Sequence, residues 1–388
     1  MRRQEQIAEA KKLLAHLDQR TTALADAIYR NPVSDYTSPE QAAQEQELFF
    51  RNLPINIGLS ALMPRPGDWL THDWAGVPIL MVRRADGSLG AFLNACRHRG
   101  ARVVDGCGAG ARDFPCPYHG WTYGLDGSLV ARPDEPSFAG AERATHGLVA
   151  LPVVEKYGMI WVGPRPGLRL DIDHLLAGAA DDLAAYGLET YHHYETRVLR
   201  REMNWKLAVD TFCETYHLSS LHPDTVSPLF HTNRATFDAF GANHRMIGAR
   251  RTIDELRGQP EEAWNVFDHT VMIYVLFPNT IFLFQRDHVE TWHMFPGDRP
   301  DRCAMYVSLY IPEPVASDSA RRHWDNNFNL LMATVEAEDF PTCEGMQRGF
   351  LSGAQESIVF GRNEPALQHF HRSVKAALAR PRQQMAAE

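Results

Sequence analysis

The stretch CRHRGARVVDGCGAGARDFPCPYHGW, residues 96–121, contains three cysteines and two histidines in a short, glycine-rich segment. Four of these five residues form two matching pairs, Cys96-x-His98 and Cys116-x2-His119, so each half offers one thiolate and one imidazole. A zinc ion accepts two cysteines and two histidines. The usual zinc spacing, however, places the cysteines on one turn and the histidines on a helix.

A [2Fe–2S] cluster with two cysteines on one iron and two histidines on the other needs each loop to supply one of each. The pairing therefore predicts such a cluster, with zinc as the alternative. Cys107 lies midway between the pairs and is expected to be an ordinary loop thiol. Gly100, Pro117 and Gly120 are typical of loops that bring backbone N–H groups close to cluster sulfurs. Trp121 is expected to shield the cluster.

Composition indicates a globular chain with more than one domain, since it has 388 residues, 44% of them hydrophobic and 22% charged. A net charge of −9 argues against a nucleic-acid partner. The charged N-terminus has no signal-peptide core, and no apolar run approaches the roughly 18 residues of a membrane span. We therefore expect a cytoplasmic protein without a membrane partner. Cysteines outside the ligand pairs are expected to be buried thiols: Cys107, Cys213, Cys303 and Cys343.

Hydrophobic periodicity predicts three segments: a helical segment over 1–64 that packs with the last of the three, a small β-domain over 65–167 and an α+β domain over 168–388. A helix is predicted to start at Pro39, with Ser38 as its N-cap and Gln41 closing a capping box. Hairpin turns are predicted at Asp86-Gly87 and Asp126-Gly127. The last domain is expected to combine an antiparallel sheet with a helical portion from about 320 to 378.

A second group of metal-binding side chains lies in NWKLAVDTFCETYHLSSLHPDTV, residues 204–226. Asp210, Glu214 and His217 are spaced i, i+4 and i+7, which predicts one face of a helix. His222 can reach the same ion as His217 only if that helix bends or ends between them, as the following Pro223 favours. Two histidines and a carboxylate with open positions form the site of non-haem Fe(II) oxygenases. Histidines with this spacing are a weak signal alone, but a strong one downstream of a predicted cluster.

CRHRG and CPYHGW resemble the two ligand loops of a Rieske domain. Together with the second motif they resemble the alpha (terminal oxygenase) subunit of Rieske non-haem iron oxygenases, the ring-hydroxylating oxygenase family, over nearly the whole chain. The resemblance implies an α+β fold class: a small all-β Rieske [2Fe–2S] domain and an α+β, helix-grip-like catalytic domain with a central antiparallel sheet. It also implies the cofactors, namely the Rieske cluster, a mononuclear Fe(II) and O2 as co-substrate.

The resemblance assigns roles to individual residues. His217 and His222 match iron ligands, and the segment EDFPTCEGMQRG places the third ligand at Asp339, with Glu338 as the alternative. Glu214 matches the acid that links the mononuclear iron site to a Rieske histidine of a neighbouring subunit, and Asp210 is expected to support the site by hydrogen bonding. Aspartate is commoner than glutamate at the linking position. Glutamate occurs in members that resemble quaternary-amine monooxygenases.

The function implied is a terminal oxygenase that adds one or two oxygen atoms to an aromatic or mostly apolar small molecule, as in aromatic hydrocarbon catabolism. Two alternatives stay open: a monooxygenase or demethylase of a quaternary amine or an N- or O-methyl compound, and an electron carrier of the Rieske ferredoxin type. The chain has no dinucleotide-binding fingerprint, so a separate NAD(P)H reductase, with or without a ferredoxin, is expected. A homotrimer is implied, and a beta subunit is compatible with it. Candidate pocket residues are Phe212, Leu218, Leu221, Phe230, Phe282 and Phe284.

Overall fold

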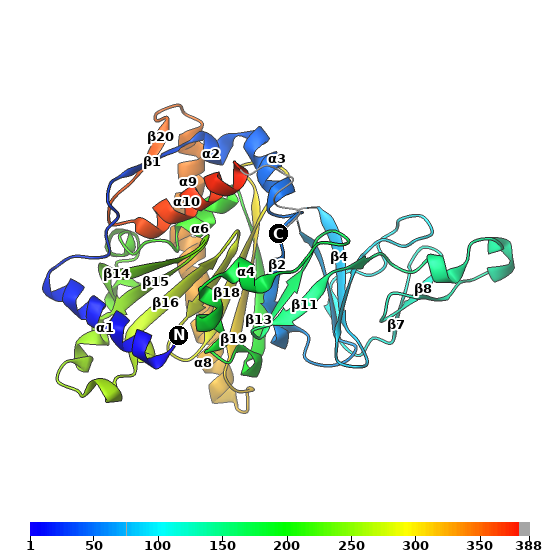
Figure 1. Cartoon of the computed structure of the whole chain (residues 1–388), viewed down its shortest axis with the longest axis horizontal. Coiled ribbons are helices and arrows are strands. Elements are labelled where there is room, and N and C mark those ends of the chain that lie inside the picture. Colours follow the sequence, from blue (N-terminus) through cyan, green and yellow to red (C-terminus); the bar gives the residue numbers. More distant parts are fainter. Residues whose placement is uncertain (75, 380–388) are drawn as a thin grey trace. The chain divides into compact units, whose positions relative to one another are not determined.

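The computed structural model describes residues 1–74 and 76–379, which form two compact units (Figure 1). The larger unit consists of residues 1–44 and 173–379, and the smaller unit of residues 45–172. The division falls near, but not at, the limits expected after residues 64 and 167. Strand β2 (Ile55–Leu59) accounts for the first difference, because it pairs with β12 (Met159–Val162) of the smaller unit.

The larger unit is built on a seven-stranded antiparallel sheet. In spatial order its strands are β13 (His192–Arg201), β19 (Cys303–Ile311), β18 (Val289–Pro296), β17 (Thr280–Phe284), β16 (Thr270–Leu276), β15 (Asn243–Arg250) and β14 (Phe230–Phe240). Strands β16 and β17 are buried at every position because both faces of the sheet are covered. The runs of apolar residues that predicted these strands are therefore typical of a fully buried sheet.

Side chains alternate between the two faces of this sheet. Ile281 pairs with Trp292, and Phe282 pairs with Tyr274, so the two pairs lie on opposite faces. One face packs against α5 (Ala179–Ala184), where Tyr274 donates to Asp182. We call the other the α8 face, because His288, just before β18, packs against Trp324 of α8 (Asp318–Thr334).

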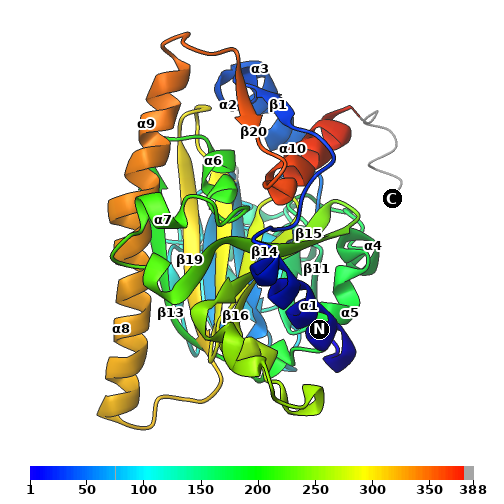
Figure 2. The same cartoon turned by 90° about the vertical axis from the view of Figure 1, so that its left-hand side faces the viewer.

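Helix α8 continues through a π-helical turn, Val335–Asp339, into α9 (Phe340–Phe350), and Figure 2 shows α8 and α9 as one long rod beside β13. A π turn inside a helix often marks a functional site. The remaining helices of the larger unit include α1 (Arg3–Asp18), α2 (Ser34–Thr37), α4 (Ile172–Leu176), α6 (Trp205–Asp210), α7 (Leu218–Leu221) and α10 (Pro365–Leu378). Short strands β1 (Tyr29–Pro32) and β20 (Ser357–Phe360) form a separate pair.

The helix expected to run from Trp205 past His217 is broken. Helix α6 ends at Asp210, and a stretch without regular structure leads to α7 (Figure 2). The expectation that Asp210, Glu214 and His217 share one helical face is therefore wrong. Local hydrogen bonds explain the break, because the Glu214 carboxylate accepts from the backbone N–H groups of Tyr216 and His217, as Asp and Glu side chains do in turns.

The smaller unit is almost entirely β-structure, in sheets ordered β10-β5-β4-β3-β6, β11-β12-β2 and β7-β8-β9. Their other strands are β3 (Trp69–Trp74), β4 (Val77–Arg83), β5 (Leu89–Leu93), β6 (Cys107–Gly108), β7 (Asp113–Pro115), β8 (Thr122–Gly124), β9 (Leu129–Ala131), β10 (Ala150–Leu151) and β11 (Val153–Lys156). Both predicted hairpins are present, with Gly87 at φ +83° and Gly127 at φ +82°.

Ser38 caps α3 (Pro39–Leu48) by accepting from the N–H of Gln41 at 3.1 Å. No described helix is long and apolar enough to cross a membrane.

Candidate metal centres

The two cysteine loops of the smaller unit have the same backbone geometry. In each, the cysteine N–H donates to the carbonyl five residues later, at 2.8 Å for both Cys96 and Cys116. The glycine four residues after each cysteine donates back to the cysteine carbonyl, at 2.8 Å for Gly100 and 3.0 Å for Gly120. Both glycines have positive φ, +80° and +69°, which other residues rarely adopt. The repeated turn presents one cysteine and one histidine from each loop.

The four predicted cluster ligands are brought together by these loops. Nδ1 of His98 lies 3.2 Å from Nδ1 of His119, so the two imidazoles converge through the same ring nitrogen. The residues Cys96 and Cys116 are 4% and 3% exposed. Burial, followed by contact with Cys96, raises the pKa of the Cys116 thiol, and a bound metal would offset this by coordinating the thiolate. These donors fit a [2Fe–2S] cluster with two cysteines on one iron and two histidines on the other.

Two aromatic side chains support this group. The Trp121 ring is stacked on His98, with centroids 4.9 Å apart and planes 9° apart. The Tyr123 hydroxyl lies 3.2 Å from Sγ of Cys96 and accepts from the N–H of Arg97 at 2.9 Å. Trp121 was expected beside the cluster. The contact between Tyr123 and Cys96 was not expected, because the spacing of the two cysteine loops does not show which side chain of β8 reaches Cys96.

Cys107 lies outside this group. It is exposed in β6, where it pairs with Leu70 of β3. Its expected burial is therefore wrong, since an exposed two-residue edge strand offers no core to pack against. Cys213, Cys303 and Cys343 are buried, as expected.

The larger unit brings His217, His222 and Asp339 together. One ligand atom from each lies within 4.8 Å of the others. Nε2 of His222 is 3.2 Å from Oδ1 of Asp339, and Nε2 of His217 is 3.7 Å from the same oxygen. The histidines flank α7 as its N-cap and C-cap residues, and Asp339 ends the π turn. Two imidazoles and one carboxylate on one side fit a non-haem Fe(II) ion with open positions.

Each histidine of this triad is oriented by a second acid. Nδ1 of His217 bonds to Glu214 Oε1, and Nδ1 of His222 lies 2.5 Å from Glu338 Oε2. Thr225 also donates to Glu338, at 2.8 Å. Such carboxylates fix the tautomer of a metal-binding imidazole and leave Nε2 for the ion. Glu338, the alternative to Asp339 as ligand, thus occupies the supporting position.

Asp210 contacts a different group. It accepts from the Tyr36 hydroxyl at 2.7 Å and lies 2.8 Å from Nε2 of His371, on α10. Asn31 also reaches His371, at 3.4 Å. The break after α6 turns Asp210 away from the helix face shared with His217, so its hydrogen bonds join the N-terminal segment, α6 and α10 rather than the triad.

The predicted pocket residues divide between the two faces of the sheet. Phe212 packs against Trp292 on the α8 face, with centroids 5.0 Å apart, and Phe230 lies under Arg250. Leu218 and Leu221 lie on α7 between the two histidines. Phe282 and Phe284 lie on the opposite face, the one that packs against α5, where the ring centroid of Phe284 lies 3.9 Å from that of Tyr186. Strand alternation places their neighbours Ile281 and Leu283 on the α8 face instead.

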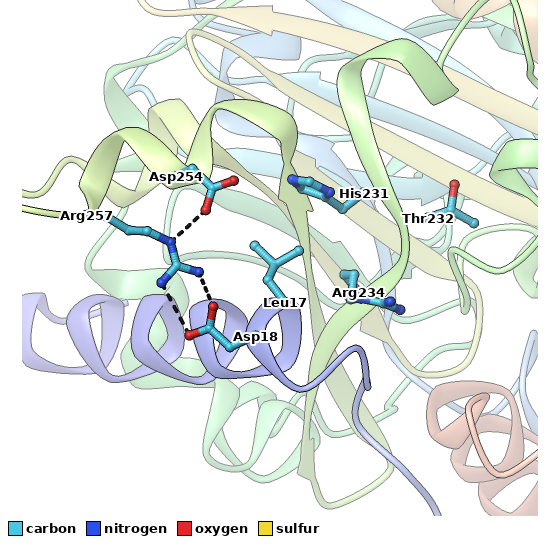
Figure 3. Close-up of a pocket in the computed structure, with 7 residues that line it drawn as sticks. All are labelled: Leu17, Asp18, His231, Thr232, Arg234, Asp254 and Arg257. Carbon is cyan, nitrogen blue, oxygen red and sulfur yellow. Dashed lines mark hydrogen bonds and ion pairs between the residues drawn. The ribbon is translucent and has the colours of Figure 1, made fainter.

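A separate surface hollow lies between α1 and the region around β14 (Figure 3). Its charges are largely satisfied, because Arg257 bonds to both Asp18, at 2.7 Å, and Asp254, at 2.7 Å. It contains none of the metal-binding groups.

Two family models match this chain. The Rieske [2Fe-2S] domain matches residues 55–154, and the ring hydroxylating alpha subunit catalytic domain matches residues 188–380. The chain belongs to the Rieske non-haem iron oxygenases. Its cofactors are a Rieske [2Fe–2S] cluster and a mononuclear iron that uses O2.

Curated relatives of this Rieske oxygenase act on different classes of compound, according to their names. Choline monooxygenase of Spinacia oleracea is 28% identical over 360 residues, covering 88% of this chain and 76% of the relative. The glycine betaine monooxygenase oxygenase subunit of Chromohalobacter salexigens is 31% identical, covering 51% and 44%. The biphenyl 2,3-dioxygenase alpha subunit of Rhodococcus jostii is 32% identical, covering 52% and 43%.

Solved structures share the fold. A quaternary ammonium Rieske monooxygenase in complex with L-carnitine has a TM-score of 0.77 at 20% identity, covering 94% of this chain and 96% of the other. A naphthalene 1,2-dioxygenase mutant bound to phenanthrene has a TM-score of 0.75 at 17% identity, covering 94% and 96%. Both expected domains, a Rieske domain and a catalytic domain with a large antiparallel sheet, are thereby confirmed.

Proposed function

We propose that this Rieske oxygenase is a monooxygenase of a small quaternary ammonium compound. This was the alternative in the sequence analysis, which favoured an aromatic or mostly apolar substrate. The observation that carries the proposal is the similarity to choline monooxygenase over 88% of the chain. Glu214 supports it, because glutamate at this position occurs in members that resemble quaternary-amine monooxygenases. Trp292 and Phe212 pack together beside residues that adjoin the triad, and aromatic faces bind quaternary ammonium groups well.

In this proposal His217, His222 and Asp339 would hold the iron, and three protein ligands would leave positions open for O2 and substrate. The two metal centres, when bound, supply electron storage and O2 activation. The net reaction joins one oxygen atom to a substrate C–H bond and releases the other as water, consuming two electrons and two protons. Glu214 and Glu338 keep the Nδ1 protons of the two histidines in place while this occurs.

Electrons would come from a separate NAD(P)H reductase, directly or through a ferredoxin. We infer that Glu214 bonds on its far side to a Rieske histidine of a neighbouring subunit, so that three chains close a ring. His119 is exposed and His98 half-buried within the chain, so both are available for such a contact.

The test is reconstitution with a reductase, NADH and a panel of compounds, followed by coupled O2 uptake and product mass. We expect uptake with choline, glycine betaine or carnitine and a gain of one oxygen atom, or formaldehyde where the hydroxylated carbon is an N-methyl group. The similarity to the biphenyl dioxygenase subunit favours one other candidate, an aromatic dihydroxylase. That candidate predicts uptake with aromatic compounds and a gain of two oxygens and two hydrogens.

A further inference from the structure

The α8 face of the sheet carries a buried carboxylate with an unused oxygen. Glu290, the second residue of β18, is 3% exposed. Its Oε1 lies 3.1 Å from Nε2 of His288. Its Oε2 is buried and has no hydrogen-bond partner among the residues that the structure describes. Burying an unpaired carboxylate oxygen is unfavourable, so this atom is suited to a ligand with positive charge.

The same face leads to the metal-binding triad. Trp292, two residues further along β18, points to the same side as Glu290 and is roughly 7 Å from it along the strand. The Trp292 ring lies 5.0 Å from Phe212 and 6.2 Å from Phe340, which directly follows Asp339. Its Nε1 is also buried without a partner in the described part of the chain. Two unbonded polar atoms therefore lie on one face of one strand, close to residues beside the triad.

Beside Glu290, one histidine is shared between two acids. His288 also bonds to Asp287, at 2.8 Å. Burial lowers the pKa of His288, but the bonds to Asp287 and Glu290 outweigh it and raise the pKa to about 9. His288 therefore bonds to Glu290 through Oε1 only and leaves Oε2 unpaired.

The arginine at the same end of this face does not neutralise Glu290 by direct contact. Arg250 donates to the carbonyl of Thr270 at 3.1 Å and to Gln285 at 2.5 Å. Its guanidinium lies 4.7 Å from the ring centre of Phe230. The described ion pairs include none between Arg250 and Glu290, so Oε2 stays available.

We propose that Glu290 Oε2 is the counter-ion for the cationic nitrogen of the substrate, with the Trp292 indole as the aromatic wall beside it. The inference rests on the proposed function, because it concerns the same site. A quaternary ammonium group has no N–H to donate, so negative charge and aromatic faces are what can recognise it. Away from water the charge of Glu290 acts strongly. It therefore discriminates against neutral molecules of the same shape.

Calorimetry on the iron-loaded protein without O2 tests this role. The probes are choline and 3,3-dimethylbutan-1-ol, which has carbon in place of the charged nitrogen. We expect wild type to bind choline more tightly than the alcohol. Glu290→Gln should weaken choline binding at least tenfold and change the affinity for the alcohol less than twofold. No preference in wild type, or equal weakening of both probes by the variant, overturns the inference.

Glu195→Gln is the matched control, because Glu195 lies on β13 of the same sheet and is already paired, with Arg197 at 2.7 Å. It should leave both affinities unchanged. Iron content and the Rieske absorption spectrum should be the same in all three proteins, which excludes misfolding. If wild type oxidises a quaternary ammonium compound while Glu290→Gln binds choline normally, only the inference fails. If wild type oxidises aromatic compounds alone, the proposed function fails.

Discussion

His222 lies between two consecutive acids, with Nδ1 2.5 Å from Glu338 and Nε2 3.2 Å from Asp339. Both acids belong to the π turn, an element that is frequent at functional sites. The two acids have different tasks in our account: Asp339 faces the ion, and Glu338 fixes the ring.

Glu338→Ala should weaken iron binding by roughly 10–100-fold, the usual effect of losing a carboxylate that orients a metal-binding histidine. Iron content after dialysis against graded chelator, with the Rieske spectrum as internal reference, measures this. Glu336→Ala is the control, since Glu336 instead pairs with Arg201 at 2.8 Å. Equal iron content in all three proteins would refute the orienting role.

Asp210→Asn should reduce stability rather than iron content. Asp210 bonds to Tyr36 and His371, so the loss of a charged acceptor is expected to cost about 1–3 kcal/mol of unfolding free energy. Thermal unfolding and iron analysis separate the two effects. A variant that loses its iron but keeps full stability would show that Asp210 instead supports the metal site.

Tyr123→Phe should lower the reduction potential of the Rieske cluster, because a hydrogen bond to Sγ of Cys96 stabilises the more negative reduced state. Protein-film voltammetry measures the potential. Tyr118→Phe is the control, since Tyr118 is exposed in the Cys116 loop and its hydroxyl accepts from Arg99. A potential unchanged by Tyr123→Phe, or lowered equally by both variants, would contradict the contact.

His288→Gln should change how stability depends on pH. The pKa of His288 is raised from 6.5 to about 9 in the folded protein, so its contribution is complete below pH 6.5 and is lost as pH rises toward 9. At most about 3 kcal/mol follows from this difference. Melting temperatures of wild type and variant should therefore differ most at pH 6 and converge near pH 9.5. A constant difference across this range would show that His288 is neutral.

The sequence predicted those parts of the molecule that short-range patterns determine. The paired Cys-x-His and Cys-x2-His spacing predicted loops that bring four ligand side chains together, and Asp-Gly turns predicted both hairpins. Family resemblance, rather than spacing, supplied Asp339, because more than a hundred residues separate it from His222.

Other features depended on tertiary structure. The break after Asp210 was not predicted, because the spacing of Asp210, Glu214 and His217 is that of a helix. The Glu214 carboxylate instead accepts from the backbone N–H of His217, a bond that competes with helical hydrogen bonding. Phe282 and Phe284 lie on the face opposite Phe212, which the sequence did not predict, since alternation says which residues share a face but not which face lies nearer the triad. Glu290 carries no sequence motif at all.

Product analysis under 18O2, with reductase and NADH, tests the central claim most directly. The account predicts that a quaternary ammonium compound gains one labelled oxygen per O2 consumed, and that Asp339→Ala abolishes this while its Rieske spectrum is retained. Incorporation of two labelled oxygens into an aromatic compound, without turnover of any quaternary ammonium compound, would contradict it.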